Sequence, residues 1–488
     1  MTTENISEVL KERLLKIEAL KAGGRDLYGE RFLPIESIEG ILKNFEEHKK
    51  VKIAGRLMGI RSHGKSAFAD LKDENAKIQI YVKKDAVVDE AYDFFSKLDM
   101  GDIVGVDGEL FKSKSGEMSV KVNEFKLLSK IVEVLPEKWH GLKDVEIRYR
   151  RRYVDLIANE ETRQIFKKRS SIIRRIREML DKKGFMEVET PMMQSMAGGA
   201  KAEPFVTHHN TLHMDLFLRI APELYLKRLL VGGFEKVYEI NRNFRNEGIS
   251  VKHDPEFTMM ELYWAYANYE DMMNLTEEIV TELVKEVTGG KEAITYGEKE
   301  LNFKRPWKRI SFYGSLKEKT GIDWQKCDMK AEAKRLGIRM ESHFKEADIL
   351  NEVFAEKVEA GLVDPTFVVD YPLFMSPLAK QKAGEPDLVD RFELFISNME
   401  LANAYSELND PFEQKKRFEA QLAQTGEKKM DEDFVKALEY GMPPAGGLGI
   451  GIDRLVMLLT NSHSIREVIL FPQLRPEAAS SESAESSK

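Results

Sequence analysis

Two strands joined by a polar loop constrain the fold of this chain more than any other stretch. Alternation of residue types predicts strands over 237–247 and 256–263. Because side chains alternate between strand faces, Arg245 and Glu247 are expected to share a face of the first. One face of the second would carry Phe257, Met259, Glu261 and Tyr263. Such a face suits the binding of a nucleotide, because Arg can donate two hydrogen bonds to a phosphate and an aromatic ring can stack on a base. A solvated charged face is the alternative.

Composition and charge limit the classes of protein to consider. A length of 488 residues predicts about three domains. The net charge of −8 means that any nucleic-acid contact has to rest on a local basic patch. The single cysteine, Cys327, excludes an intramolecular disulfide and a cysteine-based metal site. Without a secretory signal pattern or an apolar run near about 18 residues, we expect a soluble, cytoplasmic protein with no membrane anchor.

Five short runs rich in β-branched residues characterise residues 51–130. Five such strands, with a longer link after the third, favour a β-barrel of the OB type. The link over 85–98 has a helical pattern. Residues 1–50 form an N-terminal extension, in which Ile6–Lys21 has the spacing of an amphipathic helix. That helix can lie on the protein surface or contact a nucleic acid, and the sequence does not decide between them.

Basic residues surround an aromatic residue in this part of the chain. Arg56, Arg61, His63 and Lys65 lie around Phe68. Single-stranded bases bind to such a combination, because the charges contact the backbone and the ring stacks on a base. Phe68 can equally be a core residue of the barrel, and OB folds also bind sugars and proteins. The pattern alone leaves the ligand of this domain open.

The remaining chain reads as a connector followed by one large domain. Residues 131–165 are the expected connector, and a basic cluster within 148–152 can contact a nucleic acid or another domain. The large domain is expected over 166–476, with a helical insertion near 288–365 in which we see no chemistry. The last residues, 477–488, are rich in Ala, Ser and Glu, and we expect them to be disordered.

Acidic residues gather on two neighbouring strands expected in the last quarter of the chain. Glu393 and Glu400 can flank a divalent cation, because carboxylate oxygens are the hard ligands that Mg²⁺ prefers. Strict alternation puts Asn403, Tyr405 and Glu407 on one face of the second strand, and Glu400 on the other. Either a β-bulge intervenes or these groups do not share a pocket.

A glycine-rich segment, 443–459, is the second dense motif. Its glycines let the backbone approach a ligand closely, and the apolar run after Asp453 predicts a helix that opens at Arg454. It is not a P-loop, because no Gly-Lys-Ser/Thr follows, and the acidic partner of a dinucleotide-binding fingerprint is missing. A glycine-rich core strand would not explain the Asp-Arg pair at its end. The glycines are Gly446, Gly447, Gly449 and Gly451.

Three segments resemble the motifs of class II aminoacyl-tRNA synthetases, in the order of that family. Gly184–Pro191 is similar to motif 1, Phe244–Glu261 to motif 2, and Gly446–Arg454 to motif 3. An OB fold ahead of the catalytic domain is typical of the lysine, aspartate and asparagine subgroup. Stretches such as RIAPELYLKRL and ELANAYSELND resemble bacterial lysyl-tRNA synthetases. The resemblance implies an α+β fold, with a five-stranded OB barrel before a catalytic domain built on an antiparallel sheet flanked by helices.

The resemblance also implies a reaction. Lysine and ATP would give lysyl-adenylate and pyrophosphate, and the lysyl group would then pass to the 3′ end of tRNA(Lys). Arg245, Glu247 and Arg454 would be catalytic, with Arg245 on the α-phosphate. Phe257 and Arg454 would enclose the adenine, and Glu393 and Glu400 would bind Mg²⁺. The full set implied at ATP is Arg245, Glu247, His253, Phe257, Glu393, Glu400 and Arg454.

The implied lysine pocket is rich in carboxylates. Several carboxylates with no dedicated cation suit an ammonium side chain, whereas an aspartate pocket would need an Arg or Lys directed inward. This disfavours an aspartyl- or asparaginyl-type synthetase. A non-catalytic tRNA-binding or regulatory paralogue would tend to lose catalytic side chains, and a ligase that lysylates an elongation factor usually lacks the OB domain. The pocket residues are Gly199, Glu223, Glu261, Tyr263, Asn403, Tyr405 and Glu407.

Three further expectations follow from the resemblance. Arg61, Phe68 and Gln79 would contact the anticodon, with Phe68 stacked on a base. Motif 1 would form the interface of a homodimer. Asp254 is a departure, because many relatives are expected to have Asn there, and a carboxylate can alter the charge near the nucleotide.

Overall fold

The computed structural model describes residues 8–135, 142, 144–425 and 430–476. It divides into two compact units, residues 1–143 and 144–488, which are described separately. Ile6 at the start of the expected first helix lies outside the described residues, as does the expected disordered tail, 477–488. Within the described part of the chain, no helix is both long and apolar enough to cross a membrane.

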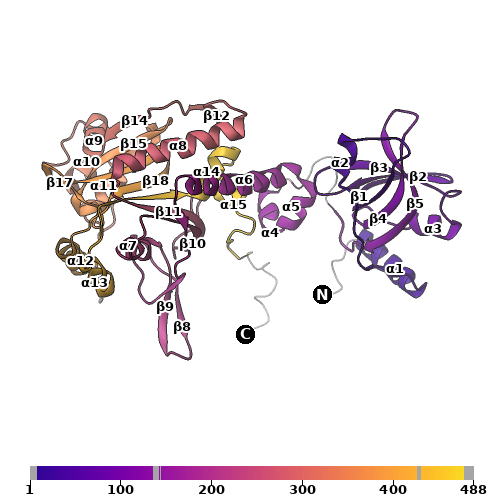
Figure 1. Ribbon diagram of the computed structural model, residues 1–488, viewed down its shortest axis with the longest axis horizontal. Coiled ribbons are helices and arrows are strands. Elements are labelled where there is room, and N and C mark those ends of the chain that lie inside the picture. The colour runs from indigo at the N-terminus through magenta and orange to yellow at the C-terminus, as the bar shows by residue number, and fades with distance from the viewer. Residues whose placement is uncertain (1–7, 136–141, 143, 426–429, 477–488) are drawn as a thin grey trace, which may run out of the picture. The chain divides into compact units, whose positions relative to one another are not determined.

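The first unit is a closed five-stranded barrel with the strand order β1-β2-β3-β5-β4 (Figure 1). The expected OB barrel is therefore confirmed. Alternation in β2 buries Ala67, Ala69 and Leu71 inside the barrel and turns Phe68 outward. The strands are β1 (Lys50–His63), β2 (Ser66–Lys72), β3 (Lys77–Lys83), β4 (Ile103–Lys112) and β5 (Met118–Ser129).

Three helices accompany the barrel. The first, α1 (Glu8–Ala22), buries Ile17 and Leu20 and is otherwise largely exposed, as its amphipathic spacing predicts. Ser37 caps α2 (Ile38–Lys43) by accepting a hydrogen bond from the Gly40 amide. The link between the third and fourth strands contains α3 (Asp89–Phe95), within the range expected to be helical.

The second unit is built on a nine-stranded sheet with the order β14-β15-β17-β18-β19-β11-β10-β6, and β16 pairs with β17. Its central strands are antiparallel, and the two outermost pairs, β14–β15 and β10–β6, are parallel. The strands are β6 (Met186–Glu187), β10 (Lys236–Phe244), β11 (Glu256–Ala265), β14 (Lys308–Ser311), β15 (Thr366–Pro372), β16 (Gln381–Lys382), β17 (Glu385–Ile396), β18 (Met399–Ser406) and β19 (Ala445–Gly451).

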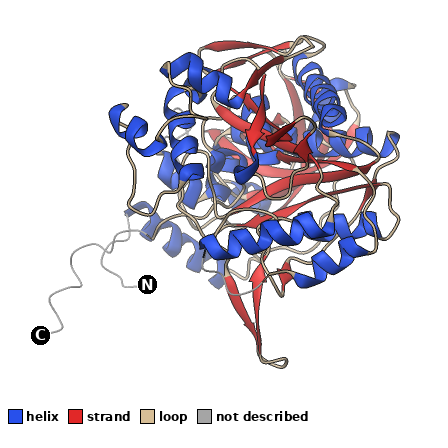
Figure 2. Ribbon diagram, turned by 90° about the vertical axis from the view of Figure 1, so that its left-hand side faces the viewer, coloured by secondary structure: helices blue, strands red, loops and turns tan. Residues whose placement is uncertain are grey.

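Three helices cover one face of this sheet and leave the other face for the site (Figures 1 and 2). They are α6 (Glu160–Lys182), α8 (Tyr269–Thr288) and α14 (Ile452–Thr460). Asn268 and Asp271 form a capping box at the start of α8, and Gly289 ends it with a positive φ of 70°. Apolar residues of the helices pack against alternate residues of β18 and β19, so the polar residues between them face the opposite side.

The segment 288–365 is more than a helical insertion. Its strand β14 forms an edge of the main sheet, which local patterns did not predict because the pairing partner β15 lies far along the chain. Strands β12 (Ala293–Tyr296) and β13 (Lys299–Asn302) form a separate hairpin. The helices here are α9 (Phe312–Thr320), α10 (Met329–Arg335) and α11 (Glu346–Lys357), with a 3-10 turn over Glu359–Gly361.

A second small sheet, β7-β9-β8, extends from the body of this unit as a projecting hairpin (Figures 1 and 2). Its strands are β7 (Met193–Gln194), β8 (Val206–His209) and β9 (Met214–Leu218). The remaining helices are α4 (Val145–Arg150), α5 (Arg152–Ala158), α7 (Glu223–Val231), α12 (Pro411–Thr425), α13 (Glu432–Glu439) and α15 (Ile465–Val468), with a 3-10 turn over Leu373–Met375.

The basic cluster near residue 150 is partly structural. Arg152 is buried, forms an ion pair with Asp155 at 2.6 Å and donates to the carbonyl oxygens of Arg466 and Leu470. It therefore ties α5 to the C-terminal segment of its own unit, and its guanidinium is bonded internally and not exposed for a nucleic acid. Tyr153 nearby remains exposed.

Candidate active site

A cavity of about 2290 Å³ lies on the face of the main sheet that the three helices leave uncovered. Strands β11, β17, β18 and β19 form its floor, and the loop 195–204 and the start of α7 form a wall. The expected nucleotide and metal residues that line it are Arg245, Glu247, His253, Phe257, Glu393, Glu400 and Arg454. The expected lysine residues that line it are Gly199, Glu223, Glu261, Tyr263, Asn403 and Tyr405.

Strand register explains why residues distant in sequence meet here. One row across four strands consists of Glu393, Asn403, Gly449 and Glu261. The next row consists of Arg391, Tyr405, Gly447 and Tyr263. Residues directly opposite in antiparallel strands point to the same face. Because β19 contributes only glycines to these two rows, side chains of the neighbouring strands can extend over it.

Neighbouring side chains leave no room for a side chain at Gly447. A Cβ atom added there would lie 1.9 Å from Glu407 Oε1 and 2.7 Å from Tyr263 Cε1, which no packing can accommodate. The glycine-rich strand is therefore neither a P-loop nor a phosphate cradle of that kind. It is a central strand of the sheet whose missing side chains leave room for the acidic and aromatic groups of its neighbours.

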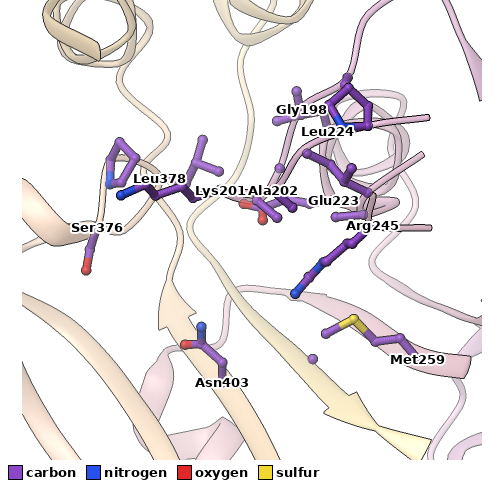
Figure 3. A pocket seen from close by; sticks show the side chains of 18 of the residues that line it. Gly198, Lys201, Ala202, Glu223, Leu224, Arg245, Met259, Ser376, Leu378 and Asn403 are labelled. Atoms are coloured by element: carbon purple, nitrogen blue, oxygen red, sulfur yellow. The ribbon is translucent and has the colours of Figure 1, made fainter. Parts of the chain in front are cut away.

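Arg245 is the prominent cation of the cavity. It extends inward between Glu223 and Met259 (Figure 3). Strand β10 ends at Phe244, so Arg245 and Glu247 belong to the following loop and not to a strand face as expected. The amide of Arg245 donates to Pro255 O at 2.9 Å, which fixes the loop against β11. Its guanidinium carbon lies 5.0 Å from the Phe257 ring centroid, which holds the side chain by a cation–π contact.

Arg454 lies at the start of α14 and reaches the edge of the same cavity. It donates to Glu400 O at 2.6 Å, and its other terminal nitrogen is 3.1 Å from His253 Nε2. Burial and the neighbouring Arg454 charge lower the pKa of His253, which favours the neutral ring. The adjacent Asp453 is structural, because it accepts from the Thr258 amide at 2.6 Å and from Arg169 at 2.5 Å.

The acidic pair on β17 and β18 combines one restrained and one freer carboxylate. Glu393 accepts from Tyr371 OH at 2.7 Å and from Arg391 at 2.5 Å. Burial raises the pKa of Glu393, Arg391 opposes the rise, and the charge of Glu400 adds to it. A cation between the two carboxylates would relieve this repulsion, so the donor set fits a divalent ion such as Mg²⁺. Within the described residues, no cluster of three or more His, Cys, Asp or Glu side chains could hold a metal unaided.

A β-bulge in β18 brings Glu400 to the cavity face. Leu394 pairs with Ala402, whereas the next residue, Phe395, pairs with Glu400. Leu401 is thus the extra residue, and the alternation of β18 changes phase there. Glu400 and Asn403 consequently both line the cavity, and Leu401, which the cavity also touches, belongs to the hydrophobic core. Of the two possibilities that the sequence leaves open, the structure has the bulge.

One carboxylate of the cavity has no cationic partner at bonding distance among the residues that the structure describes. Glu261 is 6% exposed and accepts a hydrogen bond from Tyr263 OH at 3.1 Å. Burial and the negative charge of Glu223 raise the pKa of Glu261 to about 8. Without a ligand this carboxyl is therefore largely protonated at neutral pH, and an ammonium group nearby would favour its ionised form.

The acidic pocket has a cation next to it that the sequence analysis did not expect. Lys227, fully buried on α7, lies 2.7 Å from Glu223 Oε1 and forms an ion pair with Glu407. Glu407 itself does not line the cavity but lies behind it, 1% exposed. The signal was present in the sequence, because Glu223 and Lys227 are four residues apart on one helix. The pairing with Glu407 is long-range, and no local pattern indicates it.

Arg391 is a second cation that sequence reasoning missed. Besides Glu393, it contacts Asn403 Oδ1 at 3.2 Å and lies 4.5 Å from the Tyr371 ring centroid. Its position two residues before Glu393 on one strand face could have indicated this role. Arg391 links the metal-side carboxylate to the floor of the amino-acid pocket.

Asp254 lies at the margin of the cavity, 5% exposed. Its Oδ1 accepts from the Glu256 amide at 3.2 Å, as an Asx turn does. Burial raises the pKa of Asp254, so the carboxyl is less charged than its residue type suggests.

The outer face of the barrel forms a separate candidate site in the first unit. Phe68 is half-buried, and its ring lies 4.7 Å from that of Tyr81, which is 5.9 Å from Phe111. Arg61 pairs directly with Phe68 across the strands and donates to Asp70 at 3.3 Å. Gln79 is 8% exposed and donates to Glu117 at 2.8 Å. Tyr81 and Phe111 extend the aromatic row beyond the expected residues.

Comparisons with known proteins agree with this arrangement. A family model for class II tRNA synthetases (D, K and N) matches residues 144–475, and one for an OB-fold nucleic acid binding domain matches residues 51–128. A lysine–tRNA ligase of Carboxydothermus hydrogenoformans is 56% identical over 98% of this chain and 100% of its own length. Those of Pelotomaculum thermopropionicum and Moorella thermoacetica are 55% and 52% identical, covering 97% and 98% of this chain and 96% and 100% of their own lengths. The chain belongs to the class II tRNA synthetases of the aspartate, lysine and asparagine group.

Proposed function

We propose that this chain is a lysine–tRNA ligase that uses ATP and forms AMP. The observation that carries the proposal is a single cavity that is lined both by the buried carboxylates Glu223 and Glu261 and by the cations Arg245 and Arg454. The buried carboxylates suit the ammonium side chain of lysine, and the two arginines suit the phosphates of ATP. The names of the relatives, all similar over nearly their whole length, support the same reaction.

The chemistry is acyl activation by positioning and charge neutralisation. A carboxylate oxygen of lysine forms a bond to the α-phosphorus of ATP, while the bond from that phosphorus to the bridging oxygen breaks and pyrophosphate leaves. Arg245 donates to the α-phosphate and offsets the charge that develops there. A hydroxyl at the 3′ end of tRNA(Lys) then attacks the lysyl carbonyl, and AMP is the leaving group.

Each side chain has a defined place in this proposal. Phe257 and Arg454 enclose the adenine, and Glu247 and His253 lie near the nucleotide. Glu393 and Glu400 would hold Mg²⁺, which when bound neutralises phosphate charge. Gly199 contributes backbone at the amino acid. The side chains proposed to contact lysine are Glu223, Glu261, Tyr263, Asn403 and Tyr405, with Glu407 acting from behind the cavity wall.

The barrel is proposed to bind the anticodon of tRNA(Lys) through Arg61, Phe68 and Gln79. The stacked row of Phe68 and Tyr81 supports this, because aromatic faces accept unpaired bases. A cytoplasmic homodimer is proposed as the working form. Exposed apolar residues support an interface there: Met186 in the motif 1 segment, and Met193, Val206 and Leu212 in the small sheet that follows it in the chain.

Amino-acid-dependent ATP–pyrophosphate exchange with Mg²⁺, measured with all twenty amino acids, tests the proposal. Exchange with lysine alone is the expected result. Exchange with aspartate or asparagine would overturn the lysine assignment in favour of a related synthetase. Absence of exchange from folded protein would indicate a non-catalytic tRNA-binding paralogue.

A further inference from the structure

A fully buried ammonium group lies directly behind the proposed amino-acid pocket. Lys227 projects from α7 and has no exposed surface. Its Nζ atom is 2.7 Å from Glu223 Oε1 and forms an ion pair with Glu407 Oε2. Lys227 does not line the cavity, so it cannot be a ligand of the amino acid in this structure.

The two carboxylates differ in their access to the cavity. Glu223 lines it, and its second oxygen lies 3.7 Å from the position that a Cβ on Gly199 would occupy. Glu407 lies behind the wall, and its Oε1 has no hydrogen-bond donor among the described residues. Lys227 therefore binds one oxygen of Glu223 from behind and leaves the other directed at the loop that borders the site.

Charge balance depends on this lysine. A buried carboxylate without a cation is costly and takes up a proton. Burial raises the pKa of Glu407, and Lys227 opposes that rise. Burial by itself would lower the pKa of Lys227, but the charges of Glu223 and Glu407 outweigh it and the pKa is raised. The lysine thus remains an ammonium and opposes the protonation of Glu407.

We propose that Lys227 is a positioning residue for lysine recognition, which holds one oxygen of Glu223 and leaves the other oriented for an ammonium group of the substrate. Glu407 shares the positive charge of Lys227. Lys227 therefore does not bind Glu223 strongly enough to compete with the substrate. The inference rests on the proposed lysine pocket. It distinguishes Glu223 and Glu407, which pair with Lys227, from Glu261, which has no cation at bonding distance within the described part of the chain.

Lys227→Met tests the role, because it keeps the length of the side chain and removes the charge. Pyrophosphate exchange is measured from pH 6.5 to 9.5 with lysine and ATP varied separately. We expect the KM for lysine to rise at least about tenfold at pH 7 and the KM for ATP to change less than about twofold. The defect should shrink toward pH 9.5, as Glu407 ionises without its cation. Other titratable or charged groups that face this cluster are Arg219, Arg245, Glu261, Tyr263 and Tyr405.

Lys130→Met is the matched control. Lys130 is also fully buried and paired with two carboxylates, Asp99 and Asp102, but it belongs to the barrel unit. Its loss should lower the melting temperature and leave the KM for lysine unchanged. If Lys227→Met does not fold, Glu407→Gln replaces it, and a several-fold rise in the KM for lysine is expected because Lys227 then binds Glu223 alone.

The outcomes separate the inference from the proposed function. An unchanged KM for lysine in folded Lys227→Met, or an equal loss for lysine and ATP at every pH, would overturn the positioning role. Glu223→Gln is measured alongside. If it raises the KM for lysine while Lys227→Met does not, only the positioning role fails. If neither variant changes that KM, the lysine pocket itself is wrongly placed.

Discussion

The two candidate binding surfaces use similar residue types in opposite physical settings. On the barrel, Arg61 is exposed and makes one hydrogen bond, to Asp70 at 3.3 Å. In the cavity, Arg391 makes bonds to Glu393, Asn403 and Ser376 and packs on aromatic rings. An exposed pair exchanges readily with water and contributes little, whereas a buried network fixes its members and is costly to break. The chemical step should therefore depend steeply on single cavity residues, and tRNA recognition should depend weakly on many barrel residues.

The largest effect is expected from Arg245→Ala. It removes the cation proposed to contact the α-phosphate, and loss of a preorganised group of this kind costs about a thousandfold in rate. The rate of pyrophosphate exchange is the measurement. Arg242→Ala is the matched control, because Arg242 is close in sequence but pairs with Glu256, at 3.6 Å, and does not line the large cavity. If Arg245→Ala lowers the exchange rate tenfold or less, the expected steep dependence of the chemical step on single cavity residues is contradicted.

Glu393→Gln should come next. We expect the Mg²⁺ concentration needed for half-maximal exchange to rise about 10- to 100-fold, since loss of a metal-site partner has effects of that size. Removal of Mg²⁺ with a chelator should abolish exchange by the unmodified protein, and added Mg²⁺ should restore it. Glu385→Gln on the same strand is the control, because Glu385 is exposed and pairs with Lys382. An unchanged Mg²⁺ requirement would remove Glu393 from the metal site.

The barrel should show a smaller and separable effect. Phe68→Ala is expected to lower kcat/KM for tRNA about tenfold, because one stacked base contributes about that much. Pyrophosphate exchange should not change, since that reaction needs no tRNA. Tyr28→Ala removes an exposed aromatic residue from the same unit outside the barrel strands and serves as the control. A large effect of Phe68→Ala on exchange would show that the two surfaces are not independent.

The smallest effect should be a pH dependence. Glu261 has a pKa of about 8 without ligand, so the carboxyl is mostly neutral at pH 7 and mostly ionised at pH 8.5. An ammonium substrate binds the ionised form, so the KM for lysine should fall about fivefold between these pH values. Steady-state exchange at varied lysine measures it, and Glu261→Gln should flatten the profile. A KM that rises over this range would contradict the assignment of Glu261.

The sequence predicts all strands of the barrel but only some of the residues that form the cavity. Barrel strands are local patterns bounded by turns, so all five could be located. The cavity residues within recognisable motifs, such as Arg245 and Arg454, were also found. Lys227 and Arg391 were missed because their partners come together only through sheet register and helix packing. The edge strand β14 was missed for the same reason, since its pairing joins segments more than fifty residues apart.

The extra residue at Leu401 has a consequence for how this chain can vary. Up to that point β18 presents the carboxylate proposed for the metal, and beyond it the groups proposed for the amino acid, all on one side of the sheet. Deleting Leu401 would restore strict alternation and turn one of the two sets toward the helices. Substitutions of similar size should be tolerated there, but a change of length should not. The number of residues between Glu400 and Asn403 therefore has to stay the same in any redesign of either substrate pocket.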